Sequence, residues 1–163
     1  MDIYPGYRPG CIGRITELHA SYYASHVGFG LAFEAKVAGE LASFCERYTE
    51  GRDGLWLVLD GEAIHGSIAI DGAHYAEQGA HLRWFITSDA TRGQGLGGQL
   101  LDAAMDFCRQ RSYRRVHLWT FDGLHAARHL YEKHGFRLAS SERGARWGKE
   151  VREQLYTLGG ARS

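Results

Sequence analysis

A strand-like apolar stretch that leads into a glycine-rich turn constrains this chain more than any other feature. Residues 82–87 read Leu-Arg-Trp-Phe-Ile-Thr, and apolar residues recur at helical spacing from Leu100 to Cys108. Between these two segments lie four closely spaced glycines, Gly93, Gly95, Gly97 and Gly98. We therefore predict a buried strand, a tight turn and a helix that begins within the glycines.

The glycine turn has the chemistry of a phosphate site. The first N–H groups of a helix have no partner within the helix, and the helix dipole adds positive potential there. Glycines let the backbone come close to an anion because they carry no Cβ atom, and they adopt positive φ without strain. Arg92 adds a cation just before the first glycine. We expect residues 92–98 to bind phosphate groups.

Two other phosphate motifs are excluded by their context. Gly93, Gly95 and Gly98 also fit the dinucleotide pattern G-x-G-x-x-G, with Asp122 as its acidic residue. That pattern should follow its strand at once, whereas here residues 87–92 intervene and only 65 residues remain after Gly98. The nucleoside-triphosphate loop is excluded because no Lys-Ser or Lys-Thr pair follows the glycines. A plain flexible turn remains the alternative.

Two motifs resemble the signatures of the GCN5-related N-acetyltransferase (GNAT) family. The family's acetyl-CoA signature is Arg or Gln, two residues, Gly, one residue, then Gly or Ala, and Arg92, Gly95 and Gly97 match it. Residues 124–136 resemble the second signature, which contains an alanine, a Leu-Tyr pair and a Gly-Phe pair. The likeness runs from about Asp53 to Leu158. More narrowly, the chain resembles the acetyltransferase part of bacterial proteins in which this domain follows a MarR-type DNA-binding domain.

The resemblance implies a fold and a reaction. The fold is α/β, of the mixed α+β kind called the GNAT fold: a mostly antiparallel central sheet with splayed central strands and helices on both faces. The reaction is transfer of an acetyl group from acetyl-CoA to a primary amine by direct attack in a ternary complex. Two alternatives stay open, a non-catalytic regulatory module that binds acyl-CoA and an acyltransferase that uses a longer acyl-CoA.

The resemblance also places acetyl-CoA along the chain. The backbone of the strand before the glycines would pair with the pantetheine arm, and the glycine turn would hold the pyrophosphate. Leu124 stands where many members have Asn, which leaves the usual polar contact to the pantetheine region open. The expected cofactor-binding residues are Phe85, Ile86, Thr87, Arg92, Gly93, Gln94, Gly95, Leu96, Gly97, Gly98, Ala127 and Tyr131.

Two residues are the catalytic candidates. Tyr131 lies at the family's tyrosine position, where a phenol can donate a proton to the departing thiolate. The alternative is that Tyr131 is an aromatic residue of the helix that packs in the core. His81 stands where many relatives carry Glu, at the start of the strand, and a histidine titrates near neutral pH. It is our candidate general base, with a surface strand residue as the alternative. Glu77, His65 and His74 are the reserve candidates.

The acceptor amine is expected to bind near the first two helices. Tyr22, Phe29 and Glu34 are the predicted substrate-binding residues, and Tyr23 and Phe33 are further candidates for the same wall. Residues 1–78 carry five Lys or Arg and eleven Asp or Glu, whereas residues 79–163 carry fourteen and eight. The acidic half favours a small cationic amine, and the basic half favours the phosphates of coenzyme A.

Composition bounds the remaining expectations. At 163 residues the chain suits one domain, residues 1–163, with acceptor-side helices in 1–50 and the sheet and acetyl-CoA core in 53–158. Three cysteines without paired spacing indicate a reducing cytoplasm, and no apolar run is long enough for a membrane span.

The expected partner is a small-molecule or peptide amine, without nucleic acid, and a homodimer is compatible with the sequence. His125 and His129 have the spacing of a zinc pair but lack a third ligand, so we expect no metal.

Periodicity and turn signals predict the order of elements. Two helices come first, from about residue 12 and over 31–48, and a hairpin follows that turns at Asp60-Gly61. The remaining elements then alternate between strand and helix. The predicted strands are 55–59, 63–70, 81–86, 115–121, 136–139 and 155–158, and the helix of the second signature is 124–134.

Overall fold

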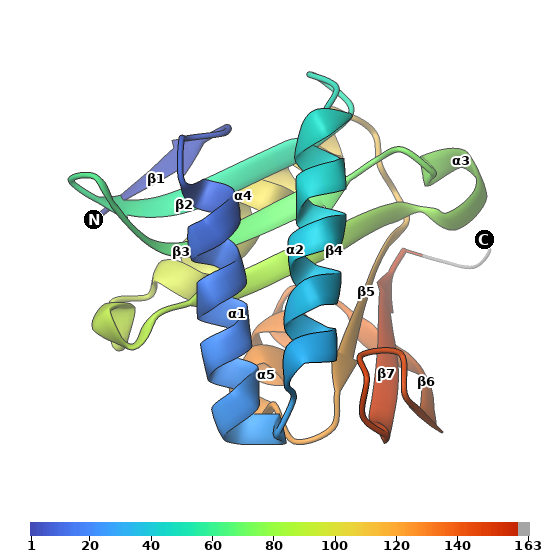
Figure 1. Ribbon diagram of the computed structural model, residues 1–163. Coiled ribbons are helices and arrows are strands. Elements are labelled where there is room, and N and C mark those ends of the chain that lie inside the picture. The colour runs from blue at the N-terminus through green and yellow to red at the C-terminus, as the bar shows by residue number, and fades with distance from the viewer. Residues whose placement is uncertain (160–163) are drawn as a thin grey trace.

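The computed structural model describes residues 1–159, so the last four residues of the expected 1–163 domain lie outside the described part. A seven-stranded sheet and its covering helices account for most of the chain (Figure 1). The elements in chain order are β1 (Asp2–Pro5), α1 (Cys11–Val27), α2 (Leu31–Glu46), β2 (Gly54–Asp60), β3 (Ala63–Asp71), α3 (Tyr75–Gln78), β4 (Ala80–Thr87), η1 (Asp89–Thr91), α4 (Leu96–Gln110), β5 (Val116–Phe121), α5 (His125–Lys133), β6 (Arg137–Gly144) and β7 (Val151–Leu158).

The sheet has the strand order β1-β2-β3-β4-β5-β7-β6. Every neighbouring pair is antiparallel except β4 and β5, which run parallel. The β2–β3 hairpin closes through Gly61 and Glu62, because Asp60 pairs with Ala63 and Gly61 adopts a φ of 62°. The predicted mostly antiparallel mixed fold is confirmed.

Helices cover both faces of the sheet, and a separate apolar core fills each side. Figure 1 shows α1 and α2 lying side by side across one face, with α4 behind the sheet. The α1–α2 side buries apolar residues such as Ile15, Leu41 and Phe44, and the α4–α5 side buries Leu100, Leu101 and Phe136. Helices α1, α2 and α4 each turn one apolar face inward because their apolar residues recur every three or four positions.

The two central strands separate soon after they meet. Along the parallel β4–β5 pair, Ala80 pairs with Val116 and His81 with His117, and the register goes no further. The rest of β4 pairs with β3 and the rest of β5 pairs with β7. The splayed central strands that the resemblance implied are therefore present.

A β-bulge bends β4 near the point where the strands separate. Ser67 pairs with Ile86 and Ala69 with Arg83, so two residues of β4, Trp84 and Phe85, lie opposite one residue of β3. Trp84 has a φ of 48°, which is unusual for a bulky side chain. The buried Ser67 hydroxyl donates a hydrogen bond of 2.6 Å to the Trp84 carbonyl and so satisfies a group at the bulge.

The structure differs from the sequence-based prediction at several places. Strand β6 continues to Gly144 instead of ending at residue 139, and the short helix α3 was not predicted. Strand β1 lies within the first fifty residues, where only helices were expected, because a four-residue edge strand that ends in proline carries little pattern. Helix α2 ends at Glu46 instead of residue 48. Strand β7 begins at Val151, four residues early, and inserts between β5 and β6. Within residues 1–159, no helix combines the length and the apolar character needed to cross a membrane.

The bulge gives a test of the fold. In Ser67→Ala the carbonyl of Trp84 loses its donor, and leaving a buried acceptor unsatisfied costs about 1–3 kcal/mol. We expect chemical denaturation to show a lower free energy of unfolding by that amount. The control is Ser43→Ala on the exposed face of α2, which should change stability by about 0.5 kcal/mol or less. Equal stability of Ser67→Ala and wild type would show that the bulge does not depend on this hydrogen bond.

Candidate active site

A cavity of about 630 Å³ lies along the end of β4, the glycine turn and the start of α5; we call it the glycine-loop cavity. Its lining combines backbone of the turn with small, apolar and a few polar side chains, and it includes the carboxylates of Asp89, which pairs with Arg92, and Asp122. Its walls include Tyr22, Tyr23, Phe85, Ile86, Thr87, Arg92, Gly93, Gly95, Leu96, Gly97, Gly98, Leu124, His125, Ala127 and Leu130.

The backbone of the glycine turn has the form expected of an anion site. Gly93 and Gly95 adopt φ angles of 79° and 70°, which favour glycine. Helix α4 starts directly after Gly95, with no acidic residue in its first turn and no side-chain cap on its N–H groups. A Cβ atom added at Gly98 would meet no other atom within 4 Å, so the turn leaves open space at this point.

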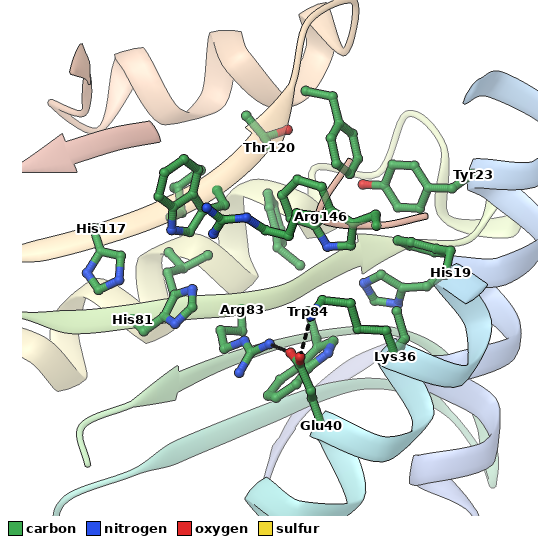
Figure 2. A pocket seen from close by; sticks show the side chains of 18 of the residues that line it. His19, Tyr23, Lys36, Glu40, His81, Arg83, Trp84, His117, Thr120 and Arg146 are labelled. Atoms are coloured by element: carbon green, nitrogen blue, oxygen red, sulfur yellow. Dashed lines mark hydrogen bonds and ion pairs between the residues drawn. The ribbon is translucent and has the colours of Figure 1, made fainter. Parts of the chain in front are cut away.

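A second cavity, of about 420 Å³, lies between α1, α2, the splayed part of β4 and β5, and the β6–β7 loop; we call it the aromatic cavity (Figure 2). Aromatic and histidine side chains make up most of its wall, together with a few charged groups. Its lining includes His19, Tyr23, Phe33, Lys36, Glu40, His81, Arg83, Trp84, Phe85, His117, Trp119, Thr120, Phe121, Tyr131, Arg146 and Trp147. Tyr23 and Phe85 line both cavities, so the two cavities adjoin.

The structure gathers most of the predicted cofactor residues at one cavity. Those that line the glycine-loop cavity are Phe85, Ile86, Thr87, Arg92, Gly93, Gly95, Leu96, Gly97, Gly98 and Ala127. Gln94 does not line it, because its side chain is exposed and donates to the carbonyl of Ala90. The Arg92 side chain is exposed and forms an ion pair with Asp89. Tyr131 lines the aromatic cavity instead.

The predicted acceptor residues are spread over different surroundings. Tyr22 lines the glycine-loop cavity, Phe29 is 4% exposed within the α1–α2 core, and Glu34 is exposed on α2 outside both cavities. The helical phase explains this result, since α2 turns Phe33 and Val37 toward the sheet and carries Glu34 away from it. Tyr23 and Phe33, the further candidates, do line the aromatic cavity.

Tyr131 lies in the last turn of α5, and its ring is surrounded by the rings of Phe85, Phe136 and Tyr156. Its side chain is 6% exposed, and its ring centroid lies 5.9 Å from that of Phe85. Burial, together with the neighbouring phenols of Tyr23 and Tyr156, raises the pKa of Tyr131 well above its usual value. The hydroxyl therefore keeps its proton at neutral pH and can donate a hydrogen bond, but the same raised pKa makes it a weaker acid than an ordinary phenol.

His81 lies where the two central strands part, and its ring stacks on His117 with centroids 4.5 Å apart. Burial lowers the pKa of His81 to about 2, and the positive charge of Arg83 adds to the effect. A general base works best when its pKa is near the working pH, so this environment does not suit that role. The reserve candidates Glu77, His65 and His74 line neither cavity.

Sequence reasoning did not identify the charged side chains of the aromatic cavity. Glu40 accepts from Arg83 and forms a 2.8 Å ion pair with Lys36. Figure 2 shows this trio at the α2 side of the cavity, with Arg146 on the other side. The spacing of Lys36 and Glu40, four residues apart on α2, indicated a helix-surface pair, and no local pattern indicated Arg83 or Arg146.

The acidic residues of the first half of the chain do not gather at the aromatic cavity. Asp53 accepts from the backbone N–H groups of Thr49 and Gly72, and Asp71 forms a 2.6 Å ion pair with Arg47. Glu40 is the carboxylate from this half that reaches the aromatic cavity. His125 lines the other cavity, and among residues 1–159 no group of three or more His, Cys, Asp or Glu side chains is placed to hold a metal ion.

Comparison with known proteins establishes the class of protein. The model of the Acetyltransferase (GNAT) family matches residues 14–136, and this chain belongs to that family. No curated protein matches the sequence significantly.

Solved structures share the fold. A GNAT-family acetyltransferase from Staphylococcus aureus Mu50 is similar with a TM-score of 0.75 and 17% identity, over 96% of this chain and 98% of that one. YncA, a putative acetyltransferase from Salmonella typhimurium solved with acetyl-CoA, is similar with a TM-score of 0.74 and 14% identity, over 100% of this chain and 96% of that one. A point mutant of the spermidine N-acetyltransferase SpeG from Vibrio cholerae is similar with a TM-score of 0.69 and 17% identity, over 97% of this chain and 94% of that one.

The buried state of His81 predicts how stability depends on pH. The folded protein holds His81 neutral down to a pKa of about 2, whereas an unfolded histidine binds a proton below about pH 6.5. Because the unfolded chain then binds more protons, acid favours unfolding, and His81 contributes about 2 kcal/mol to the stability lost between pH 7 and pH 5. Urea titrations at the two pH values measure the free energy of unfolding. We expect the fall in this free energy from pH 7 to pH 5 to be smaller in His81→Asn than in wild type by about 2 kcal/mol.

Exposed His74 provides the matched control for this measurement. His74→Asn makes the same substitution at an exposed side chain that lines neither cavity, so urea titrations of this variant give the reference for the substitution itself. An unchanged pH dependence in His81→Asn would mean that His81 is charged in the folded protein and would restore it as a candidate base.

Proposed function

We propose that this protein transfers an acetyl group from acetyl-CoA to a primary amine by direct attack in a ternary complex. The observation that carries the proposal is the junction of the two cavities at Tyr23 and Phe85, with Tyr131 on the aromatic side. One cavity suits an anionic cofactor and the other suits an organic amine. An acyl-CoA sensor without catalysis would have no use for the second cavity.

The glycine-loop cavity fits the phosphates and arm of acetyl-CoA. The unpaired N–H groups at the start of α4 and the positive-φ glycines favour an anion, and the absence of a side chain at Gly98 leaves room for it. The backbone of β4 from Phe85 to Thr87, freed from β5 by the splay, would pair with the amides of the arm. Ala127 and Leu130 of α5 form the facing wall.

Tyr131 is the proposed acid. Acetyl-CoA, when bound, supplies the acetyl group that the amine nitrogen attacks, with the coenzyme thiolate as the leaving group. Tyr131 gives its hydroxyl proton to the thiolate sulfur as the C–S bond breaks, and it recovers a proton from the acylated nitrogen through water. The raised pKa of Tyr131 keeps the hydroxyl protonated before transfer. Its buried position beside Phe85 keeps bulk water from competing for the proton.

No histidine of the aromatic cavity is a suitable base at neutral pH. Burial lowers the pKa of His81 to about 2 and of His19 to about 4, and it also lowers the pKa of His117. We infer that the amine reacts as the neutral species that solution supplies. His81 and His117 then act as a neutral stacked surface where the acceptor rests.

The relatives give this proposal context without fixing the acceptor. One is a spermidine N-acetyltransferase, and another, at 18% identity and a TM-score of 0.71, is a putative phosphinothricin N-acetyltransferase. The two acceptors in those names differ widely in charge. The likeness to MarR fusions, the homodimer and the preference for acetyl over longer acyl groups stay predictions.

A charge placed at Gly98 tests the cofactor site. Gly98 is the third residue of α4, where a Glu side chain favours the helix by about 0.3–1 kcal/mol. The same carboxylate would enter the glycine-loop cavity and repel phosphates. We expect Gly98→Glu to keep or raise the melting temperature while calorimetry shows acetyl-CoA binding weakened roughly tenfold or more.

Two variants control for this test. Gly13→Glu puts the same charge at the third residue of α1, which is exposed and lines no cavity, and should leave binding unchanged. Gly98→Ala adds only a methyl group into open space and should retain binding. Wild-type affinity in Gly98→Glu would mean that the glycine turn does not hold the phosphates.

Removing one hydroxyl tests the acid. Tyr131→Phe should lower kcat by about 10²–10⁴, the usual effect of losing a general acid, with the dissociation constant of acetyl-CoA almost unchanged. Release of coenzyme A thiol measures the rate, and calorimetry measures the binding. Tyr156→Phe is the control, because its ring lies 6.0 Å from that of Tyr131 and lines neither cavity. An equal fall of kcat in both variants would indicate a packing role for Tyr131.

A further inference from the structure

The aromatic cavity is positively charged. The charged side chains that line it, among the described residues, are the cations Lys36, Arg83 and Arg146 and the single carboxylate Glu40. Its histidines add no negative charge, since they are neutral or cationic in any state. Glu153 lies behind the lining and pairs with Arg146, so the local balance is three cations against two carboxylates. An acceptor that enters therefore meets an excess of one positive charge in a half-enclosed space, where charge interactions are stronger than in water.

Glu40 does not provide a site for an ammonium group. One of its oxygens accepts from Arg83 and the other pairs with Lys36 at 2.8 Å. Burial alone would raise the pKa of Glu40, but the hydrogen bonds from Lys36 and Arg83 lower it overall. The carboxylate is thus ionised and engaged by two cations, and it holds the Arg83 guanidinium at the cavity wall over the ring of Trp84.

Arg146 is placed to receive an anion. Its guanidinium lies 3.9 Å from the ring centroid of Trp119 and also near Trp147, so two indoles fix its orientation. Its ion pair with Glu153 is long, at 3.6 Å, and runs through Nε. The terminal nitrogens of an arginine form the fork that binds a carboxylate with two hydrogen bonds.

We propose that the acceptor of this enzyme is a small amine that also carries a carboxylate, as an amino acid does, and that Arg146 binds this carboxylate with support from Lys36 and Arg83. The inference rests on the proposed acetyl transfer and specifies its acceptor. A polyamine such as spermidine would bring only positive charge to the same cavity. It should be a poor acceptor, although the fold is shared with a spermidine N-acetyltransferase.

The same charges assist the reaction. Cations near the acceptor disfavour its ammonium form and so favour the neutral amine that attacks. The carboxylate of the acceptor offsets their repulsion during binding. This arrangement replaces a general base by the field of the cavity, and it agrees with the lowered pKa of His81, to which Arg83 and Arg146 both contribute after burial.

Matched acceptors test the inference. The common amino acids, each alongside its own carboxamide, and spermidine are assayed for release of coenzyme A thiol from acetyl-CoA. We expect an amino acid to be the best acceptor, with kcat/KM roughly tenfold or more above that of its carboxamide. A higher kcat/KM for spermidine or for the carboxamides would overturn the inference while leaving the acetyl transfer standing.

Variants of Arg146 separate carboxylate binding from differences in amine basicity. In Arg146→Gln the ratio of kcat/KM between amino acid and carboxamide should fall roughly tenfold, mainly through KM of the amino acid, and Arg146→Lys should restore part of it. Amine basicity cancels in this comparison between proteins. Arg143→Gln is the matched control, since Arg143 pairs with Glu150 on the exposed side of the β6–β7 hairpin and lines no part of the cavity. An unchanged ratio in Arg146→Gln would refute the assignment.

Binding distinguishes the two ways in which the assay could give no product. Calorimetry with acetyl-CoA shows whether the donor site works, and thermal shifts with the best amino acid in the presence of coenzyme A report the acceptor site without catalysis. Donor binding without turnover of any acceptor would overturn the proposed acetyl transfer. Turnover of amines with a carboxylate-independent thermal shift would overturn only the present inference.

Discussion

The separation of β4 from β5 is the constraint on which the rest of the structure depends. Backbone pairing holds the two strands together at Ala80 and His81 and then ends, although both strands continue. A sheet interrupted at its centre must have other elements to cover and separate the parted strands. Here α1 and α2 cover one side, α4 and α5 the other, and the β6–β7 loop closes the far end. Both cavities follow from this opening, and Tyr23 and Phe85 stand where they adjoin.

Much of this fold could be predicted from the sequence, because its signals are local. The glycines that begin α4, the hairpin at Gly61 and the apolar stripe of α4 are set by backbone freedom and helical periodicity. Strand β1 and the insertion of β7 between β5 and β6 could not be predicted in the same way. A short edge strand has little pattern, and the position of β7 depends on pairing between residues that are distant in the sequence.

The glycine-loop cavity could be predicted better than the aromatic cavity for a related physical reason. The first is built largely from two short segments, 85–98 and 122–130, each of which carries a recognisable motif. The second brings Lys36 from α2, Arg83 from β4 and Arg146 from the β6–β7 loop together, and each of them looks like an ordinary surface charge in sequence. The choice between Tyr22 and Tyr23 likewise depends on how α1 is rotated on the sheet, which only tertiary packing decides.

Charge summed along the chain and charge gathered in the cavity lead to opposite expectations about the acceptor. The first half of the chain is acidic, but Asp53 accepts hydrogen bonds from backbone N–H groups and pairs with Arg52, and Asp71 pairs with Arg47. Of the three carboxylates Asp53, Asp71 and Glu40, only Glu40 lines the aromatic cavity, and there it pairs with two cations. The potential that an incoming amine experiences is set by the groups within a few ångströms in a poorly hydrated space, not by the net charge of a sequence segment. Under the proposed function, the cations of the aromatic cavity would therefore set the acceptor preference of this protein.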